Sequence, residues 1–192
     1  MLQNLARGRV LATLAAICLA AAAPPFARGQ PAPRPAAQTP LKVGFVYVSP
    51  IGEAGWSYQH DQGRLQMQRA LGDAVRTTVV ESVPEGADAE RVIRDLAAQG
   101  HRLIFATSFG YLEPALRVAA DYPDVRFEHA GGYKTAPNLK TYDARYYEAR
   151  YLAGLLAGKT SRTGVAGYVA GFPVPEVVQG INSSFIHARQ VN

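Results

Sequence analysis

The chain has 192 residues, of which 48% are hydrophobic and 18% are charged, a composition typical of a globular protein that can bury a core. This composition excludes a disordered tail. Lys and Arg outnumber Asp and Glu by 20 to 15, but the basic residues are scattered, so the sequence does not favour nucleic-acid binding.

Residues 1–29 have the pattern of a cleaved secretory signal peptide. Two early arginines precede the uncharged stretch 10–23, which is shorter than the roughly 20 apolar residues that a membrane-spanning helix needs. We expect cleavage after Gly29, which removes Cys18, the only cysteine, and with it disulfide and thiol chemistry. Three arginines leave with the signal and no acid does, so the net charge falls from +5 to +2. Residues 30–40 contain four prolines and predict an extended leader.

From residue 41 onward, strand-like and helix-like segments alternate. Short segments rich in β-branched and aromatic residues predict buried strands at 41–49, 75–82, 101–108, 125–131 and 164–171. Apolar residues recur at helical spacing around 67–74, 92–97, 112–119 and 147–158, and the last helix is predicted within 174–192. This alternation predicts an α/β fold with a parallel, doubly wound sheet. The first lobe is expected to occupy 41–160, and 161–192 is expected to be a partial second lobe of one strand and one helix.

Ligands of such sheets bind beyond the carboxyl ends of the strands. The segments that follow four of the predicted strands are rich in Gly, aromatic and small polar residues, namely 49–56, 107–111, 129–133 and 170–176. Trp56, the only tryptophan, either is a core ring at a helix start or stacks on a planar ligand, a contact that contributes about 1–3 kcal/mol. Glu53 and Asp61 could accept hydrogen bonds from ring N–H groups or sugar hydroxyls. Phe109 and Phe172 could form the opposite wall.

Enzyme and metal sites are not favoured by the sequence. "GLLAGKT" (154–160) resembles a phosphate-binding loop, but Ala153 stands where that loop needs glycine, and a predicted helix precedes it where a strand is required. His60 and Asp61 are adjacent, so on a helix they point about 100° apart and do not form a catalytic dyad. No nucleophile elbow and no paired-histidine metal motif occurs. We therefore expect neither catalysis, nor a cofactor, nor a metal, and we expect packing roles for the tyrosines at helical spacing, Tyr142, Tyr146, Tyr147 and Tyr151.

Four motifs in order resemble a known family. "KVGFVYVSPIGEAGWSYQHDQGR" (42–64), "FATSFGY" (105–111), "YEARYLAGLLAG" (147–158) and "GYVAGFPVPEVVQGIN" (167–182) resemble the basic-membrane-protein family, the PnrA-like solute-binding proteins of ABC importers. The resemblance implies a type I periplasmic-binding fold with two α/β lobes that hold a purine base or nucleoside between them. It also implies a periplasmic location and an ABC permease of the inner membrane as the partner.

The resemblance also implies roles for individual residues. Trp56 matches the aromatic residue after the first strand, Asp61 the polar residue on the following helix, 107–111 the second binding loop and Phe172 the aromatic edge from the second lobe. With the neighbours of these positions included, the expected ligand-binding residues are Glu53, Trp56, His60, Asp61, Ser108, Phe109, Gly110 and Phe172.

The chain departs from the family in length. It stops at Asn192, so we expect a truncated second lobe, in which the pocket walls exist without a working clamp. A ligand sensor with the same fold and a non-functional fragment of a binding protein are the alternatives. A hydrolase ranks below them.

Overall fold

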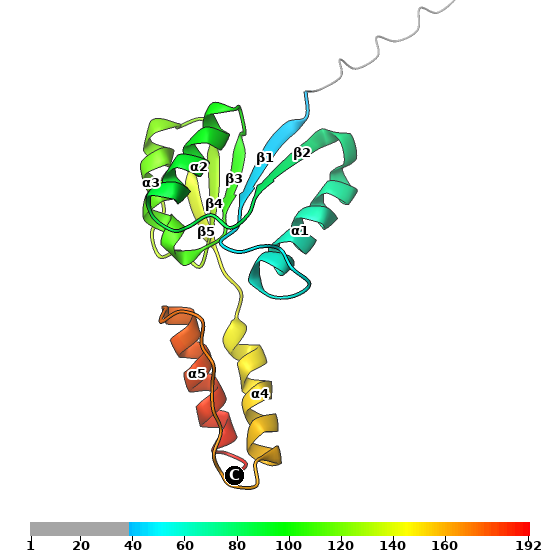
Figure 1. Cartoon of the computed structure of the whole chain (residues 1–192), viewed down its shortest axis with the longest axis vertical. Coiled ribbons are helices and arrows are strands. Elements are labelled where there is room, and N and C mark those ends of the chain that lie inside the picture. Colours follow the sequence, from blue (N-terminus) through cyan, green and yellow to red (C-terminus); the bar gives the residue numbers. More distant parts are fainter. Residues whose placement is uncertain (1–38) are drawn as a thin grey trace, which may run out of the picture. The chain divides into compact units, whose positions relative to one another are not determined.

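The computed structural model of the chain describes residues 39–192 (Figure 1). The predicted signal peptide (1–29) and all but the last two residues of the predicted leader (30–40) lie outside these described residues. The predicted α/β fold with a parallel sheet is confirmed, because the described chain forms one five-stranded sheet in the order β2-β1-β3-β4-β5 and every strand pair is parallel.

Four of the five strands are those that the sequence predicts. They are β1 (Leu41–Val46), β2 (Val75–Val80), β3 (Leu103–Ala106) and β4 (Arg126–Ala130). β5 (Leu139–Tyr142) was not predicted, since its four residues, LKTY, are too short and too polar to indicate a strand. The register places Phe45 beside Phe105 on the neighbouring strand, and their rings stack with centroids 4.7 Å apart.

Helices cover both faces of the sheet (Figure 1). α2 (Ala87–Ala98) and α3 (Leu112–Asp121) bury the larger apolar cluster, to which the strands contribute residues such as Ile104 and Phe127. α1 (Trp56–Leu71) packs on a smaller cluster around Val43 and Phe45, into which its Met67 reaches. The predicted doubly wound arrangement is thereby confirmed. Two single 3₁₀ turns complete this part, η1 (Gly72–Ala74) after α1 and η2 (Phe109–Tyr111) before α3.

After β5 the chain forms two parallel helices, α4 (Tyr146–Thr160) and α5 (Pro175–Ala188), with the same direction in Figure 1. They pack backbone to backbone. A Cβ on Gly154 would overlap the backbone carbonyl of Ser184, and one on Gly158 would lie 2.5 Å from the carbonyl oxygen of Ala188. Only glycine at these positions lets the helix axes come this close. No helix within residues 39–192 combines the length and apolarity needed to cross a bilayer.

The strand predicted at 164–171 does not form. This segment runs back along the α4–α5 pair without regular secondary structure, and most of it is exposed, Val169 completely. The sequence prediction was therefore wrong at this point. A strand needs a neighbour to accept and donate its backbone hydrogen bonds, and none of the described strands lies beside this segment.

Candidate functional site

A cavity of about 530 Å³ lies beyond the carboxyl ends of β1 and β3. This volume falls within the usual range for small-molecule sites. Three loops at the end of the sheet form part of its wall: the segment from β1 to the first residue of α1, the β2–α2 loop and the loop after β3. Residues of α4, α5 and the segment before α5 form the rest. The lining residues are Val48, Ser49, Trp56, Glu85, Ser108, Phe109, Tyr146, Arg150, Tyr168, Gly171, Phe172, Val174, Glu176 and Val177.

Trp56 is half-buried at the cavity wall, and its polar atom is already engaged. The indole N–H donates to the carbonyl oxygen of Thr107 at the end of β3. The ring contacts those of His60 and Tyr146, with centroids 4.8 and 6.0 Å away. His60 in turn has its Nδ1 3.0 Å from the Trp56 carbonyl, which can only accept, so Nδ1 carries the proton. Burial lowers the pKa of His60, which keeps the imidazole beside Trp56 neutral. Trp56 therefore offers a ligand its ring face and no donor.

The loop after β3 is held at both ends. Thr107 Oγ1 donates to the carbonyl oxygen of Val46 at 2.8 Å, and the buried Tyr111 hydroxyl donates to the carbonyl oxygen of Val83 at 2.6 Å. Between these anchors, Phe109 reaches the cavity and packs on Tyr133 at 5.8 Å between ring centroids. The position of the Phe109 ring is thus set by hydrogen bonds on either side of it.

Charged groups line the same cavity. Glu85 and Glu176 contribute carboxylates, and Arg150 contributes a guanidinium 5.9 Å from the ring centroid of Tyr168. Burial, with a smaller effect of the neighbouring Asp143 charge, raises the pKa of Glu176. Two carboxyl groups and one guanidinium thus line the cavity, and the raised pKa makes Glu176 easier to protonate than an exposed glutamate.

Four of the eight residues expected from the sequence meet at this cavity: Trp56, Ser108, Phe109 and Phe172. The other four, Glu53, His60, Asp61 and Gly110, are not among its lining residues. Their contribution to binding stays a prediction.

Asp61 lies beneath the cavity wall. It is 4% exposed, forms an ion pair with Arg64 at 2.6 Å and accepts a hydrogen bond from the Tyr47 hydroxyl at 3.4 Å. Asp61 lies five residues after Trp56 on α1, so its side chain points about 140° away from that of Trp56, toward the sheet. Glu53 is exposed, and Gly110 contacts Glu85.

Sequence reasoning missed several lining residues. Glu85 follows β2, so the rule that ligands bind at the carboxyl ends of strands could have identified it. It was missed because the 81–86 segment contains no aromatic residue that would indicate a stacking site. Tyr146 was predicted to have a packing role. Arg150 and Glu176 lie within the family motifs 147–158 and 167–182, but neither was predicted to bind ligand. The packing of α4 and α5 near the loops brings these three to the cavity.

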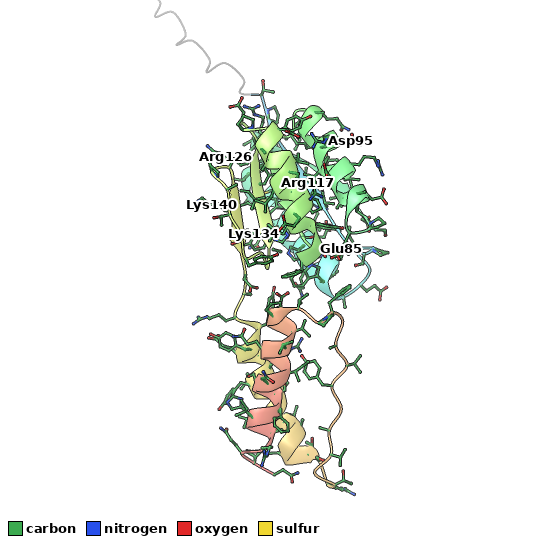
Figure 2. All side chains as sticks on the ribbon, turned by 90° about the vertical axis from the view of Figure 1, so that its left-hand side faces the viewer. Glu85, Asp95, Arg117, Arg126, Lys134 and Lys140 are labelled. Atoms are coloured by element: carbon green, nitrogen blue, oxygen red, sulfur yellow. The ribbon has the colours of Figure 1, made fainter. Side chains whose placement is uncertain are left out.

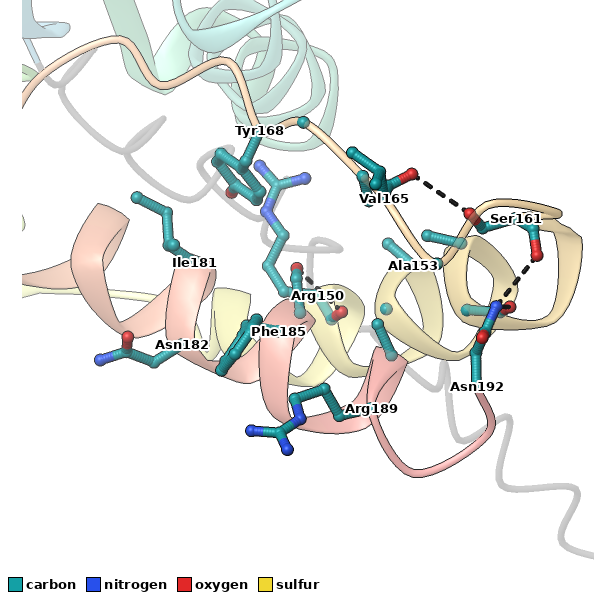
Figure 3. Close-up of a pocket in the computed structure, with 18 residues that line it drawn as sticks. Arg150, Ala153, Ser161, Val165, Tyr168, Ile181, Asn182, Phe185, Arg189 and Asn192 are labelled. Atoms are coloured by element: carbon teal, nitrogen blue, oxygen red, sulfur yellow. Dashed lines mark hydrogen bonds between the residues drawn. The ribbon is translucent and has the colours of Figure 1, made fainter.

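A second cavity, of about 630 Å³, lies between α4, α5 and the 161–168 segment (Figure 3). Several of its polar groups are occupied by one another, since Asn192 donates to the carbonyl oxygens of Gly158 and Ser161, and Ser161 Oγ donates to that of Val165. Small residues of the two helices form much of its wall, and no residue of the sheet reaches it. We therefore place the candidate site in the first cavity, although the second is larger.

Residues 39–192 contain no cluster of three or more His, Cys, Asp or Glu that could hold a metal ion. The lining residues of the first cavity offer a ligand aromatic faces, hydrogen-bonding groups and charges.

Comparisons with known proteins show the family and the fold of the chain. Residues 41–190 match the family model for ABC transporter substrate-binding proteins of the PnrA-like type. A purine-binding protein of Brucella abortus is 57% identical over 156 residues, which cover 81% of this chain and 45% of that protein. An ABC-transporter protein of Haloferax volcanii, named for glucose binding, is 45% identical over 152 residues, which cover 79% of this chain and 38% of that protein.

The fold also matches solved structures. An ABC-transporter solute-binding protein of Aeropyrum pernix superposes with a TM-score of 0.67 at 23% identity, covering 80% of this chain and 44% of that one. This match confirms the predicted fold class of periplasmic binding proteins. The chain spans somewhat less than half the length of these relatives. From residue 41 to residue 190, the chain belongs to the PnrA-like family of ABC transporter substrate-binding proteins.

Proposed function

We propose that this chain provides ligand-capturing parts of a periplasmic solute-binding protein, which binds a purine base or nucleoside and delivers it to an ABC permease of the inner membrane. One observation carries the proposal: the rings of Trp56, Phe109 and Phe172 line one cavity at the carboxyl ends of β1 and β3. Each aromatic face that stacks on a planar base contributes about 1–3 kcal/mol.

The polar groups of the cavity suit a ring that carries nitrogen donors. The Trp56 N–H is bonded to Thr107 and the Ser108 hydroxyl donates to Glu85, so these groups leave acceptors and no free donor for a ligand. The carboxyl groups of Glu85 and Glu176 add further acceptors to the lining. A nitrogen-rich base supplies donors to such acceptors, and a saturated apolar solute does not. The name of the Brucella relative supports a purine.

The cavity charge favours ligands without phosphate. Glu85 and Glu176 outnumber Arg150, and a 5′-phosphate brings a charge of about −1.5 to −2 at pH 7. Like charges at close range disfavour binding. We therefore expect adenosine to bind more tightly than its 5′-monophosphate.

The test uses the emission of the single tryptophan. Purified protein is titrated with adenine, adenosine, guanosine, the 5′-monophosphate of adenosine, and glucose. Saturable quenching by a purine that is lost in Phe109→Ala supports the proposal. The matched control is Phe185→Ala, because Phe185 is an exposed ring on α5 that does not line this cavity. This variant is expected to keep the quenching.

Two outcomes would contradict the proposal. A saturable response to glucose alone would assign the cavity to a sugar. A blue-shifted emission that no solute changes would mean that Trp56 is a packing ring and that the binding-site assignment has to be abandoned.

A further inference from the structure

The Glu85 side chain joins two loops at the mouth of the cavity. It stands between β2 and α2, and its Oε1 accepts hydrogen bonds from the Ser108 hydroxyl at 2.6 Å and from the Gly110 backbone N–H at 3.0 Å. Both donors belong to the loop after β3. Since β2 and β3 flank β1 in the sheet, this one oxygen connects the loops on either side of β1. Figure 2 shows Glu85 at the end of the sheet that faces α5.

The loop is shaped to receive this carboxylate. A Cβ on Gly110 would lie 2.6 Å from Glu85 Oε1 and would overlap the rest of the carboxyl group. Any side chain at position 110 would therefore push Glu85 away. The two hydrogen bonds and the absence of a side chain at position 110 together fix where the carboxylate lies.

The second carboxylate oxygen is not used within the described chain. No hydrogen bond from residues 39–192 reaches Oε2, and no Lys, Arg or His of that part forms an ion pair with Glu85. Glu81 and Glu113 also have one oxygen engaged, by the Ile51 N–H at 2.7 Å and by Lys134, but neither of them lines the cavity. Glu85 thus lines the cavity with one oxygen fixed and the other available.

We propose that Glu85 is a specificity-determining residue whose Oε2 accepts a hydrogen bond from an N–H or O–H donor of the ligand. This inference rests on the proposed function and names the ligand chemistry that the same cavity selects. An ionised carboxylate only accepts, so it favours an amine, a ring N–H or a hydroxyl at this place and disfavours a carbonyl or phosphate oxygen. A hydrogen bond to a charged group is worth a factor of about 10 to 100 in affinity.

The first test is Glu85→Gln, assayed by Trp56 emission. The Gln carbonyl oxygen can accept from Ser108 and Gly110, which turns the amide NH₂ toward the cavity and presents a donor in place of an acceptor. We expect affinity for adenosine to fall about 10- to 100-fold, and affinity for inosine, which carries a carbonyl in place of the amine, to fall less. Glu148→Gln removes an exposed carboxylate outside the cavity and should change neither value.

Analogues identify the donor. If the exocyclic amine is the donor, wild-type protein binds purine riboside, which lacks it, 10- to 100-fold more weakly than adenosine, and Glu85→Gln removes this difference. If a ribose hydroxyl is the donor, adenosine loses affinity in the variant and adenine does not.

A second variant tests the same carboxylate without changing it. Gly110→Ala should displace Glu85 and reduce adenosine affinity, and the double variant with Glu85→Gln should bind no more weakly than the weaker single variant. Circular dichroism melts show whether each variant is folded.

If wild-type protein binds a purine and Glu85→Gln binds every ligand as tightly as wild-type protein does, the role of Glu85 is overturned and the proposed function stands. If wild-type protein binds no purine, the proposed function fails, and this inference fails with it.

Discussion

His129 in β4 is a buried histidine whose charge state should make the stability of the fold depend on pH. None of its side chain is exposed, and neither ring nitrogen has a hydrogen-bond partner within the described chain. Burial lowers the pKa of His129 to about 4, from an ordinary value near 6.5. The folded state therefore binds this proton less readily than the unfolded state does.

The sign and size of the effect follow from these two pKa values. Because the unfolded state binds the proton first, the free energy of unfolding falls as the pH drops below about 6.5, and the loss is complete below about pH 4. The full loss is about 3 kcal/mol, of which about 2 kcal/mol is reached at pH 5. Relative to wild type, His129→Leu should remove this loss.

Urea unfolding at pH 8 and pH 5, followed by far-UV circular dichroism, measures the effect. Between pH 8 and pH 5, the free energy of unfolding should fall by about 2 kcal/mol more in wild-type protein than in His129→Leu. All other titrating groups are common to both proteins. Ile104→Val is the control, because it trims a fully buried residue of β3 and should cost about 0.5–1.5 kcal/mol equally at both pH values. An identical pH-dependent loss in wild type and His129→Leu would refute the reasoning.

Two further predictions concern the ion pair beneath the site and the α4–α5 contact. Asp61→Asn leaves the largely buried Arg64 without its ion-pair partner and should lower the free energy of unfolding, measured in urea, by about 3 kcal/mol. Asp88→Asn removes an exposed ion pair and should lower it by less than about 1 kcal/mol. Equal costs would mean that the burial of Asp61 has no energetic consequence. Gly154→Ala should lower the thermal midpoint, because the clash with the Ser184 backbone, at about 1–3 kcal/mol, outweighs the gain of about 1 kcal/mol in helix propensity. A clear rise in the midpoint would show that the two helices can separate at little cost.

Much of the sheet could be predicted from the sequence, because buried parallel strands leave continuous apolar runs such as 43–46 and 103–106. β5 could not, since its hydrogen bonds to β4 and not its own residues make LKTY a strand. The reverse holds for 164–171, where the residues are strand-like and none of the strands within 39–192 lies beside them. In both cases, hydrogen bonding to a neighbouring strand decides whether a strand forms, and a local sequence pattern does not contain that information.

The candidate site divides in the same way. Trp56 and Phe109 stand out in the sequence because large rings directly follow buried strands. Glu85 does not, because its place in the cavity depends on donors from Ser108 and Gly110, more than 20 residues further along the chain. Stacking residues were thus visible from composition and strand order. The charged groups became visible only once the loops were brought together.

The all-parallel sheet also has a consequence for how fast the chain folds. Within the described part of the chain, no strand pair is joined by a tight hairpin, and even the shortest crossover, from Phe127 to Leu139, encloses about a dozen residues. Pairing Leu41 with Val75 closes a loop of more than 30 residues, and pairing Val43 with Leu103 closes one of about 60. Closing each loop costs conformational entropy of the chain before the strand pairing can stabilise it. Sheets of this kind therefore form in milliseconds to seconds, slower than helical bundles. Because β1 pairs only across the two long loops, its insertion between β2 and β3 is expected to be the slow step. The loops that carry Trp56, Glu85 and Phe109 would then meet only when that step is complete.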